Sequence, residues 1–259
     1  MKIIYIANSL IPSRSANSIQ VMKMCEALSK KVGEVILIIP LSWKGAFKKT
    51  DLFDYYCIKN TFRIKKLVSL PGKGIGLFYL LAAFFTIFQK TKIIYTRQLE
   101  AAMLASFLHQ GFILELHTDL IDSLDRFFFD RIKESSYFLL LVLISGYLKK
   151  RFLKYGFDKD RIRVLPDGVD TDMFKAITVK ENSKKRVGYG GHLFKGRGIE
   201  LIEGLAEDMP DIDFYLWGGT DELIDLWKKR TKDIDNIFFK GHVDSRTLAE
   251  ELAKCDVLI

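Results

Sequence analysis

Short apolar runs alternate with amphipathic segments along nearly the whole chain. The short runs have the length and residue types of buried strands, and the amphipathic segments repeat their apolar positions with the period of a helix. The predicted strands are Lys2–Ala7, Val35–Pro40, Tyr55–Ile58, Ile93–Thr96, Phe112–Leu116, Phe138–Ile144, Arg163–Leu165, Arg186–Gly190, Asp213–Trp217, Ile237–Lys240 and Val257–Ile259. The predicted helices are Ile19–Lys31, Leu99–His109, Tyr147–Tyr155, Gly198–Ala206, Asp221–Lys229 and Ser245–Lys254. Such alternation indicates an α/β protein whose parallel sheets are covered by helices on both faces.

A turn-rich segment, Pro166-Asp167-Gly168, interrupts this alternation. Proline and glycine so close together favour a turn between two series of strands and helices, and 259 residues are enough for two domains of ordinary size. We therefore expect two Rossmann-like, doubly wound domains, residues 1–166 and 167–259. The last strand has no helix after it, which would leave an open apolar flank on a parallel sheet. The second domain is therefore expected to be incomplete, in a truncated chain.

Two stretches are unusually apolar, Leu77–Phe88 and Tyr137–Ile144. Both are far shorter than the ~20 residues that a helix needs to cross a bilayer. We interpret Tyr137–Ile144 as a buried central strand and Leu77–Phe88 as a core helix. A helix that lies on a membrane surface is the alternative for Leu77–Phe88, because basic residues flank it: Lys65, Lys66, Lys73, Lys90 and Lys92.

Positive charge is concentrated in the first half of the chain. Up to Arg163 the sequence has 26 Lys and Arg against 13 Asp and Glu, whereas the remainder has 14 against 19. A basic first domain favours an anionic partner, and a membrane surface is one such partner. Nucleic acid is not expected, because it favours aromatic residues interleaved with basic ones, and here the basic residues gather near an apolar helix.

The cysteines and the N-terminus indicate the compartment. The three cysteines are scattered and show no paired spacing, which argues for a reducing environment and against disulfides or a zinc site. After Lys2 the apolar run ends at Ala7, whereas a secretory signal needs roughly seven or more apolar residues. We expect a cytoplasmic protein, with peripheral attachment to the inner face of the membrane as the alternative.

Ligands of doubly wound sheets bind at the loops that follow the strands. The first loop, Asn8–Ser18, has no glycine, which argues against a dinucleotide-binding site. Its polar residues, among them Ser15 and Asn17, lead to a predicted N-cap at Ser18 and to a helix N-terminus that can bind an anion.

The loop Gly188–Gly198 combines several glycines with Lys195 and Arg197 between a strand and a helix. Glycines permit close approach of the backbone, and the helix N-terminus and the two cations attract negative charge. The loop therefore predicts a diphosphate site. The simpler alternative is a surface turn that happens to be basic. It lacks the GK[ST] sequence of ATP-hydrolysing loops.

His117 follows a predicted strand and stands beside Asp119 and Asp122. This position favours a site residue, although a lone histidine is commonly structural. No second histidine or cysteine lies at metal-ligand spacing, so we expect no metal.

Five motifs, in order, resemble those of the retaining nucleotide-sugar glycosyltransferases of family 4, which have the GT-B architecture. They are Pro12–Met24; Pro166-Asp167-Gly168-Val169-Asp170 with Phe174; Gly191-His192-Leu193 with Arg197-Gly198-Ile199-Glu200; Leu216-Trp217-Gly218-Gly219; and Phe239-Lys240-Gly241-His242-Val243 with Glu250-Glu251-Leu252 and Cys255-Asp256-Val257. The resemblance implies two Rossmann-like domains facing a cleft, with sugar transferred from a nucleotide diphosphate sugar to a glycan or lipid-linked glycan with retained anomeric configuration.

The resemblance also implies roles for single residues. Arg197 and His192, with Gly191 and Lys195, would bind the donor diphosphate, and His192 replaces the usual arginine. His117 would face the transferred sugar. The remaining implied positions are Gly219, Gly241 and Val243 at the nucleobase and donor, Ser15 and Asn17 in the first loop, and Arg97 and Asp119 on the acceptor side. No cofactor and no metal are implied, and the family's E-x7-E motif would fall after Ile259.

Two other interpretations remain open at this point. The first is a GT-B-type nucleotide-sugar epimerase. The second is a non-catalytic fragment that binds anionic lipid through its basic N-terminal domain, and the truncated chain itself is expected to be inactive on that interpretation.

Overall fold

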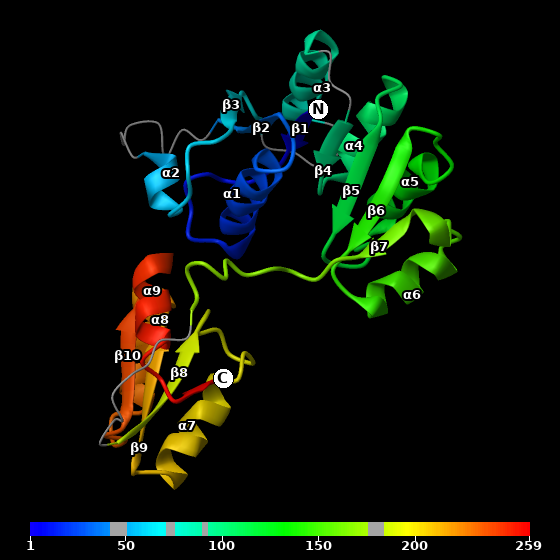
Figure 1. Ribbon diagram of the computed structural model, residues 1–259. Coiled ribbons are helices and arrows are strands. Elements are labelled where there is room, and N and C mark those ends of the chain that lie inside the picture. Colours follow the sequence, from blue (N-terminus) through cyan, green and yellow to red (C-terminus); the bar gives the residue numbers. More distant parts are fainter. Residues whose placement is uncertain (42–50, 71–75, 90–92, 176–183) are drawn as a thin grey trace. The chain divides into compact units, whose positions relative to one another are not determined.

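The computed structural model describes residues 1–41, 51–70, 76–89, 93–175 and 184–259 (Figure 1). Within these residues the chain forms two compact units, Met1–Asp167 and Gly168–Ile259. Each unit has its own parallel sheet, and each is described by itself below.

The sheet of the first unit has the strand order of a doubly wound fold. Its described strands, from one edge to the other, are β3 (Arg63–Leu67), β2 (Glu34–Pro40), β1 (Lys2–Ile6), β4 (Ile93–Thr96), β5 (Phe112–Leu116), β6 (Phe138–Leu143) and β7 (Ile162–Val164). Neighbouring strands all run parallel. The order reverses between β1 and β4, and the carboxyl ends of strands at such a switch point are where ligands bind.

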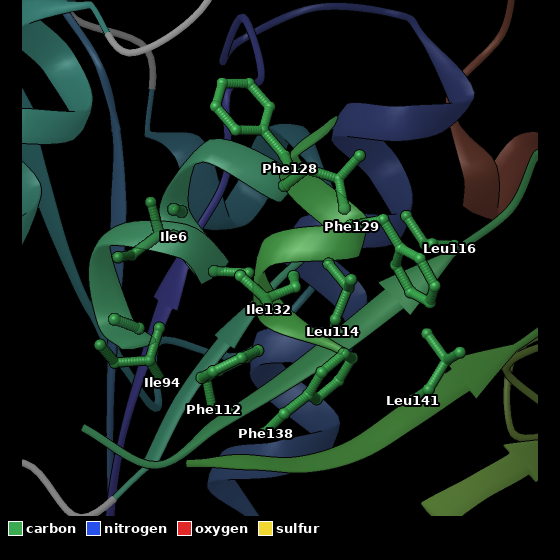
Figure 2. Close-up of a cluster of buried hydrophobic side chains, with 14 of the residues drawn as sticks. Ile6, Ile94, Phe112, Leu114, Leu116, Phe128, Phe129, Ile132, Phe138 and Leu141 are labelled. Atoms are coloured by element: carbon green, nitrogen blue, oxygen red, sulfur yellow. The ribbon is translucent and has the colours of Figure 1, made fainter. Parts of the chain in front are cut away.

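Helices cover both faces of this sheet. The packing of apolar side chains places α3 (Leu77–Phe88), α4 (Leu99–Phe107), α5 (Ser123–Ile132) and α6 (Gly146–Lys154) on one face. The helices α1 (Ala16–Ser29) and α2 (Leu52–Tyr55) lie on the other, and the short 3₁₀ turn η2 (Lys159–Arg161) precedes β7. Figure 2 shows the first of these cores, where aromatic side chains of β5, β6 and α5 meet.

The second unit repeats the arrangement on a smaller scale. Its described strands follow the order β10 (Ile237–Gly241), β9 (Ile212–Trp217), β8 (Lys185–Gly190) and β11 (Val257–Leu258), all parallel. Helices α7 (Ile199–Asp208) and α8 (Asp221–Arg230) supply buried residues to its core, and α9 (Ser245–Leu252) contacts β8. The switch point here lies between β8 and β11. Two parallel, doubly wound α/β sheets were predicted, and that prediction is confirmed.

Some predicted elements are wrong. Tyr55–Ile58 is not a strand: Tyr55 ends α2, whose N-cap Asp51 accepts a hydrogen bond from the Phe53 amide at 2.8 Å. The neighbouring edge strand is β3, which the sequence pattern missed because its lysines and arginine resemble a solvated segment. Two apolar side chains of the expected strand, Tyr56 and Ile58, are nevertheless buried.

The start of the first helix also differs from the prediction. Ser15, and not Ser18, is the N-cap of α1, and its hydroxyl accepts a hydrogen bond from the Ser18 amide at 3.3 Å. Ser18 is fully buried, and its own hydroxyl donates to the carbonyls of Ser13 and Ser15. The run of serines therefore forms the cap as a group.

The two apolar stretches fold as the pattern indicated. Leu77–Phe88 is the helix α3, and Tyr137–Ile144 contains the strand β6. Among the residues that the structure describes, no helix combines the length and the apolar character required to cross a membrane.

The core of the first unit gives a test of this packing. Phe138 is 1% exposed and its ring lies 4.7 Å from that of Phe112 and 4.8 Å from that of Phe157. We expect Phe138→Ala to lower the free energy of unfolding by about 3–5 kcal/mol, through lost burial and an unfilled cavity. Urea denaturation of the full chain measures this, with Phe127→Ala on the exposed side of α5 as the control. Equal losses for both variants would contradict the described core.

Candidate functional site

The carboxyl ends of β1, β4 and β5 bring polar side chains together in the first unit. Residues alternate between the two faces of a strand, so Glu115 and His117 share the face that α1 covers. Gln20 of α1 reaches both of them, and Arg97 follows the end of β4. These side chains come from separate parts of the chain and meet at the carboxyl edge of the sheet, next to its switch point.

A buried carboxylate, Glu115, lies at the centre of this group. It is 2% exposed and accepts hydrogen bonds from the Tyr95 hydroxyl, from Gln20 Nε2 at 3.1 Å and from His117 Nε2 at 2.5 Å. Burial by itself raises the pKa of Glu115, but the hydrogen bonds from His117 and Tyr95 and the nearby charges of His117 and Arg97 outweigh it. The net pKa is therefore below its ordinary value, and Glu115 is a carboxylate at neutral pH.

The amide of Gln20 links this carboxylate to a cation and to a second acid. Its nitrogen also donates to Asp167 Oδ1 at 2.9 Å, and its oxygen accepts from Arg97. Arg97 donates further to Asn17 Oδ1 at 2.9 Å. Because carboxylates only accept and guanidinium groups only donate, these partners define which end of the Gln20 amide carries oxygen.

The partners of His117 define its ring in the same way. Since Glu115 is an acceptor, Nε2 carries the hydrogen that joins the two residues. Nδ1 lies 3.7 Å from Asp167 Oδ2, beyond hydrogen-bond distance. The ring is mostly enclosed, with its side chain 16% exposed. His117 therefore keeps Nδ1 for a further partner, while Glu115 holds its other nitrogen.

Two other predicted residues of this unit have different surroundings. Ser15 caps α1. Asp119 binds Arg151 Nε at 2.6 Å and accepts from the Tyr155 hydroxyl at 2.9 Å, which ties the loop after β5 to α6. Burial raises the pKa of Asp119, but these two hydrogen bonds and a third from the Leu120 amide lower it by more. The net pKa is therefore below its ordinary value. The described hydrogen bonds do not join Ser15 or Asp119 to Glu115.

In the second unit, glycines line the ends of three neighbouring strands. The Gly191 amide donates to the Trp217 carbonyl at 3.0 Å, and the Gly218 amide donates to the Gly241 carbonyl at 2.8 Å. Gly218 has a φ of +116°, and a Cβ there would lie 2.1 Å from the Gly191 oxygen. Only glycine fits this approach, so the backbones at the ends of β8, β9 and β10 pack closely together. The predicted positions Gly191, Gly219 and Gly241 belong to this edge.

The loop between β8 and α7 carries three exposed basic residues, His192, Lys195 and Arg197. It is anchored by Leu193, which is fully buried and whose carbonyl accepts from the Trp227 indole at 2.8 Å. The His192 and Phe194 rings stack at 5.2 Å. Within the described part of the chain, Lys195 and Arg197 form no ion pair. Their charges therefore face solvent, where an anion can reach them.

The start of α7 adds to this positive potential. Gly196 and Gly198 have φ of +80° and +90°, which turns the loop into the helix. The first amides of a helix have no intrahelical partners and carry a partial positive charge, and the Gly196 amide already binds Glu200 at 3.1 Å. The loop and the helix start thus combine exposed cations with helix amides, two features that attract anions. Val243 lies just after β10 and is partly buried, and its contacts assign it no role.

Two residues of the first site were missed from the sequence, Glu115 and Gln20. Glu115 could have been found, because it is a lone acid inside the apolar strand Phe112–Leu116 and a buried charge requires partners. Gln20 could not, because a polar residue near the start of a helix is ordinary.

Among known proteins, only solved structures are similar to this chain, and they identify its fold. No protein-family pattern matches the chain, and no curated protein matches it. The structure of Anabaena Alr3699/HepE in complex with UDP and glucose is similar over all of this chain and 73% of its own, with 17% identity and a TM-score of 0.68. A glycosyltransferase from Rickettsia africae ESF-5 is similar over 99% of this chain and 72% of its own, with 16% identity and a TM-score of 0.72.

A UDP-N-acetylglucosamine 2-epimerase is also similar, over all of this chain and 72% of its own, with 12% identity and a lower TM-score of 0.54. At these identities the likeness establishes the fold and nothing finer. The predicted GT-B-like fold, with two Rossmann-like domains, is confirmed.

The geometry around Glu115 predicts a change in the tautomer of His117. We expect Glu115→Leu to remove the acceptor that holds the Nε2 hydrogen, so that Nε2 is no longer fixed as the hydrogen-bearing nitrogen of His117. Long-range ¹H–¹⁵N NMR of the four histidines, with His117→Asn to assign the signal, measures this. Glu134→Gln, on an exposed position, is the control. An unchanged Nε2–H in Glu115→Leu would rule out this role of the carboxylate.

The lowered pKa of Glu115 predicts a pH dependence of stability. Its stabilising contribution is present above the unfolded-state pKa, about 4.3, and is lost as pH falls through the lower folded value. We expect the free energy of unfolding of the wild type to fall more steeply below about pH 4.3 than that of Glu115→Gln. Urea denaturation between pH 3 and 7 compares the two slopes, and parallel curves would contradict the assigned charge state.

Proposed function

We propose that this protein transfers a sugar from a nucleoside diphosphate sugar to an acceptor, as retaining glycosyltransferases of family 4 do. The observation that carries the proposal is the loop of the second unit. There, the exposed cations Lys195 and Arg197 and the start of α7 adjoin glycine-lined strand ends. At the same edge, the missing side chain of Gly218 lets the backbones of two strand ends approach each other closely, because a Cβ there would lie 2.1 Å from the Gly191 oxygen.

The chemistry of the leaving group fits this loop. When the bond to the sugar breaks, the nucleoside diphosphate gains negative charge that has to be stabilised in the transition state. Fixed cations and helix amides do this electrostatically, and Arg197, Lys195 and His192 are the residues that we assign to it. The same cations neutralise the diphosphate without a metal ion, which is why we expect none as a cofactor.

The polar group of the first unit fits the sugar side of such a reaction. His117, held by Glu115 through Nε2, offers Nδ1 toward a further partner. We propose that this nitrogen binds a hydroxyl of the transferred sugar and thereby orients it. Arg97 and Asn17, which are joined by a hydrogen bond, are proposed to contact the acceptor, a glycan or a lipid-linked glycan.

An epimerase of the same architecture is the second candidate, because one solved structure similar to this chain is an epimerase. The two activities differ in their products. A transferase releases a nucleoside diphosphate and needs an acceptor, whereas an epimerase returns an intact nucleotide sugar with one inverted centre. Analysis of the nucleotide sugars after incubation without acceptor separates them, and accumulation of an epimer would overturn the transferase proposal.

Nucleotide binding tests the assigned cations. We expect UDP or another nucleoside diphosphate, supplied at 100 times its Kd, to stabilise the full chain by roughly 2.7 kcal/mol in a thermal-shift panel of nucleotides and nucleotide sugars. Arg197→Ala is expected to lose about 1.5–3 kcal/mol of the binding free energy, since a charge-assisted hydrogen bond is removed. Lys229→Ala, an exposed cation of α8, is the matched control. Unchanged affinity in Arg197→Ala would refute the assignment.

The proposed metal independence is tested by chelation. We expect the nucleotide affinity measured in excess EDTA to equal that in magnesium, because the diphosphate is neutralised by side chains and helix amides. A stabilisation that appears only with magnesium would show that a cation belongs to the site.

A further inference from the structure

Helix α3 is built almost entirely from apolar residues, yet only one of its faces is buried. All twelve of its residues are uncharged. Phe78, Tyr79 and Ala82 face the core of the first unit. The polar atoms on this inner side are satisfied: Thr86 Oγ1 donates to the Ala83 carbonyl at 2.6 Å and to Gln110 at 2.8 Å. The inner face thus accounts for about half of the helix.

The opposite face of α3 presents five large apolar side chains to solvent. They are between 37% and 66% exposed: Leu77, Leu80, Phe84, Ile87 and Phe88. Steps of three, four, three and one residues keep them within an arc of about 100° on the helix surface. Phe84 and Phe88 contact each other with ring centroids 4.8 Å apart. Single exposed apolar residues are common, but a continuous stripe of this kind marks an interaction surface.

Positive charge lies beside this stripe. α3 packs against the edge strand β3, and Lys65 of β3 places its ammonium group 5.9 Å from the centre of the Phe85 ring. Among the residues described, Lys65 and Lys66 have no carboxylate partner, whereas Arg63 pairs with Glu34. Lys73, Lys90 and Lys92, which flank α3 in the sequence, lie outside the described residues.

We infer that the exposed face of α3 docks the first unit on an acidic lipid bilayer, with the helix lying in the plane of the interface. The apolar stripe would enter the boundary between headgroups and acyl chains, while Lys65 meets lipid phosphates. A helix of twelve residues is about 18 Å long and cannot span the ~30 Å hydrocarbon layer.

A second copy of the chain is a poorer occupant of this surface. Self-association through the stripe would bring the lysines of β3 and two strongly basic units together, at a cost in like-charge repulsion. An acidic bilayer instead matches both the apolar stripe and the positive charge. The inference stands on the surface of the first unit and does not depend on the proposed sugar transfer.

Vesicle co-sedimentation tests the inference with the full chain. We expect binding to vesicles of phosphatidylcholine and phosphatidylglycerol at 3:1, much weaker binding to phosphatidylcholine alone, and a fall in affinity as salt is raised. The double variant Phe84→Gln/Phe88→Gln is expected to lower the partition coefficient about tenfold or more. Lys65→Gln is expected to lower it about fivefold and to weaken its salt dependence.

The matched control is Leu201→Gln/Leu226→Gln, which removes two exposed apolar side chains from helices of the second unit. It should bind vesicles as the wild type does. Thermal unfolding and circular dichroism verify that each variant is folded, which the exposure of all the changed residues favours.

Three results would overturn the inference. The wild type fails to bind acidic vesicles, or the Phe84/Phe88 variant binds them as well as the wild type does, which would show adsorption by charge alone. The third is a lipid-free wild-type dimer that this variant converts to a monomer in light scattering, which would assign the stripe to a second copy.

Discussion

Parallel pairing of the strands is the constraint on which the rest of this protein depends. Hydrogen bonds between parallel strands place all their carboxyl ends at one edge of each sheet, and the crossover helices start at that edge. In the first unit this edge gathers Glu115, His117 and Arg97, and in the second it gathers the glycine-lined ends of β8, β9 and β10. Both groups bring together residues that are far apart in the sequence.

A buried charge then organises the first of these groups. A carboxylate removed from water is costly unless donors surround it, and Glu115 meets three, from β4, from α1 and from the residue just after its own strand. Gln20 is held further by Arg97 and Asp167, and the ring of His117 and the amide of Gln20 are both oriented by one acid. The second group has no such buried charge. Its strand ends are glycines that pack closely, and its cations are exposed on the neighbouring loop.

The two faces of α3 show that an apolar pattern does not by itself define a core. The same run of residues packs the first unit through Phe78 and Ala82 and presents Phe84 and Phe88 to solvent. The inner face stabilises the fold by burial. The outer face remains exposed, and a lipid bilayer is the occupant that we propose for it. The buried core surface and the proposed docking surface are thus two sides of one short helix.

The sequence alone determined the α/β class, the parallel sheets and the loop with Lys195 and Arg197, because period and glycine content are local properties. It misplaced the strand near Tyr55, since the Asp51 cap and the pairing of β3 with β2 lie outside such patterns. Only the tertiary structure showed that Glu115, Gln20 and Asp167 meet around His117, and that one face of α3 stays uncovered. Contacts between residues far apart in the chain are fixed by packing, which no local pattern encodes.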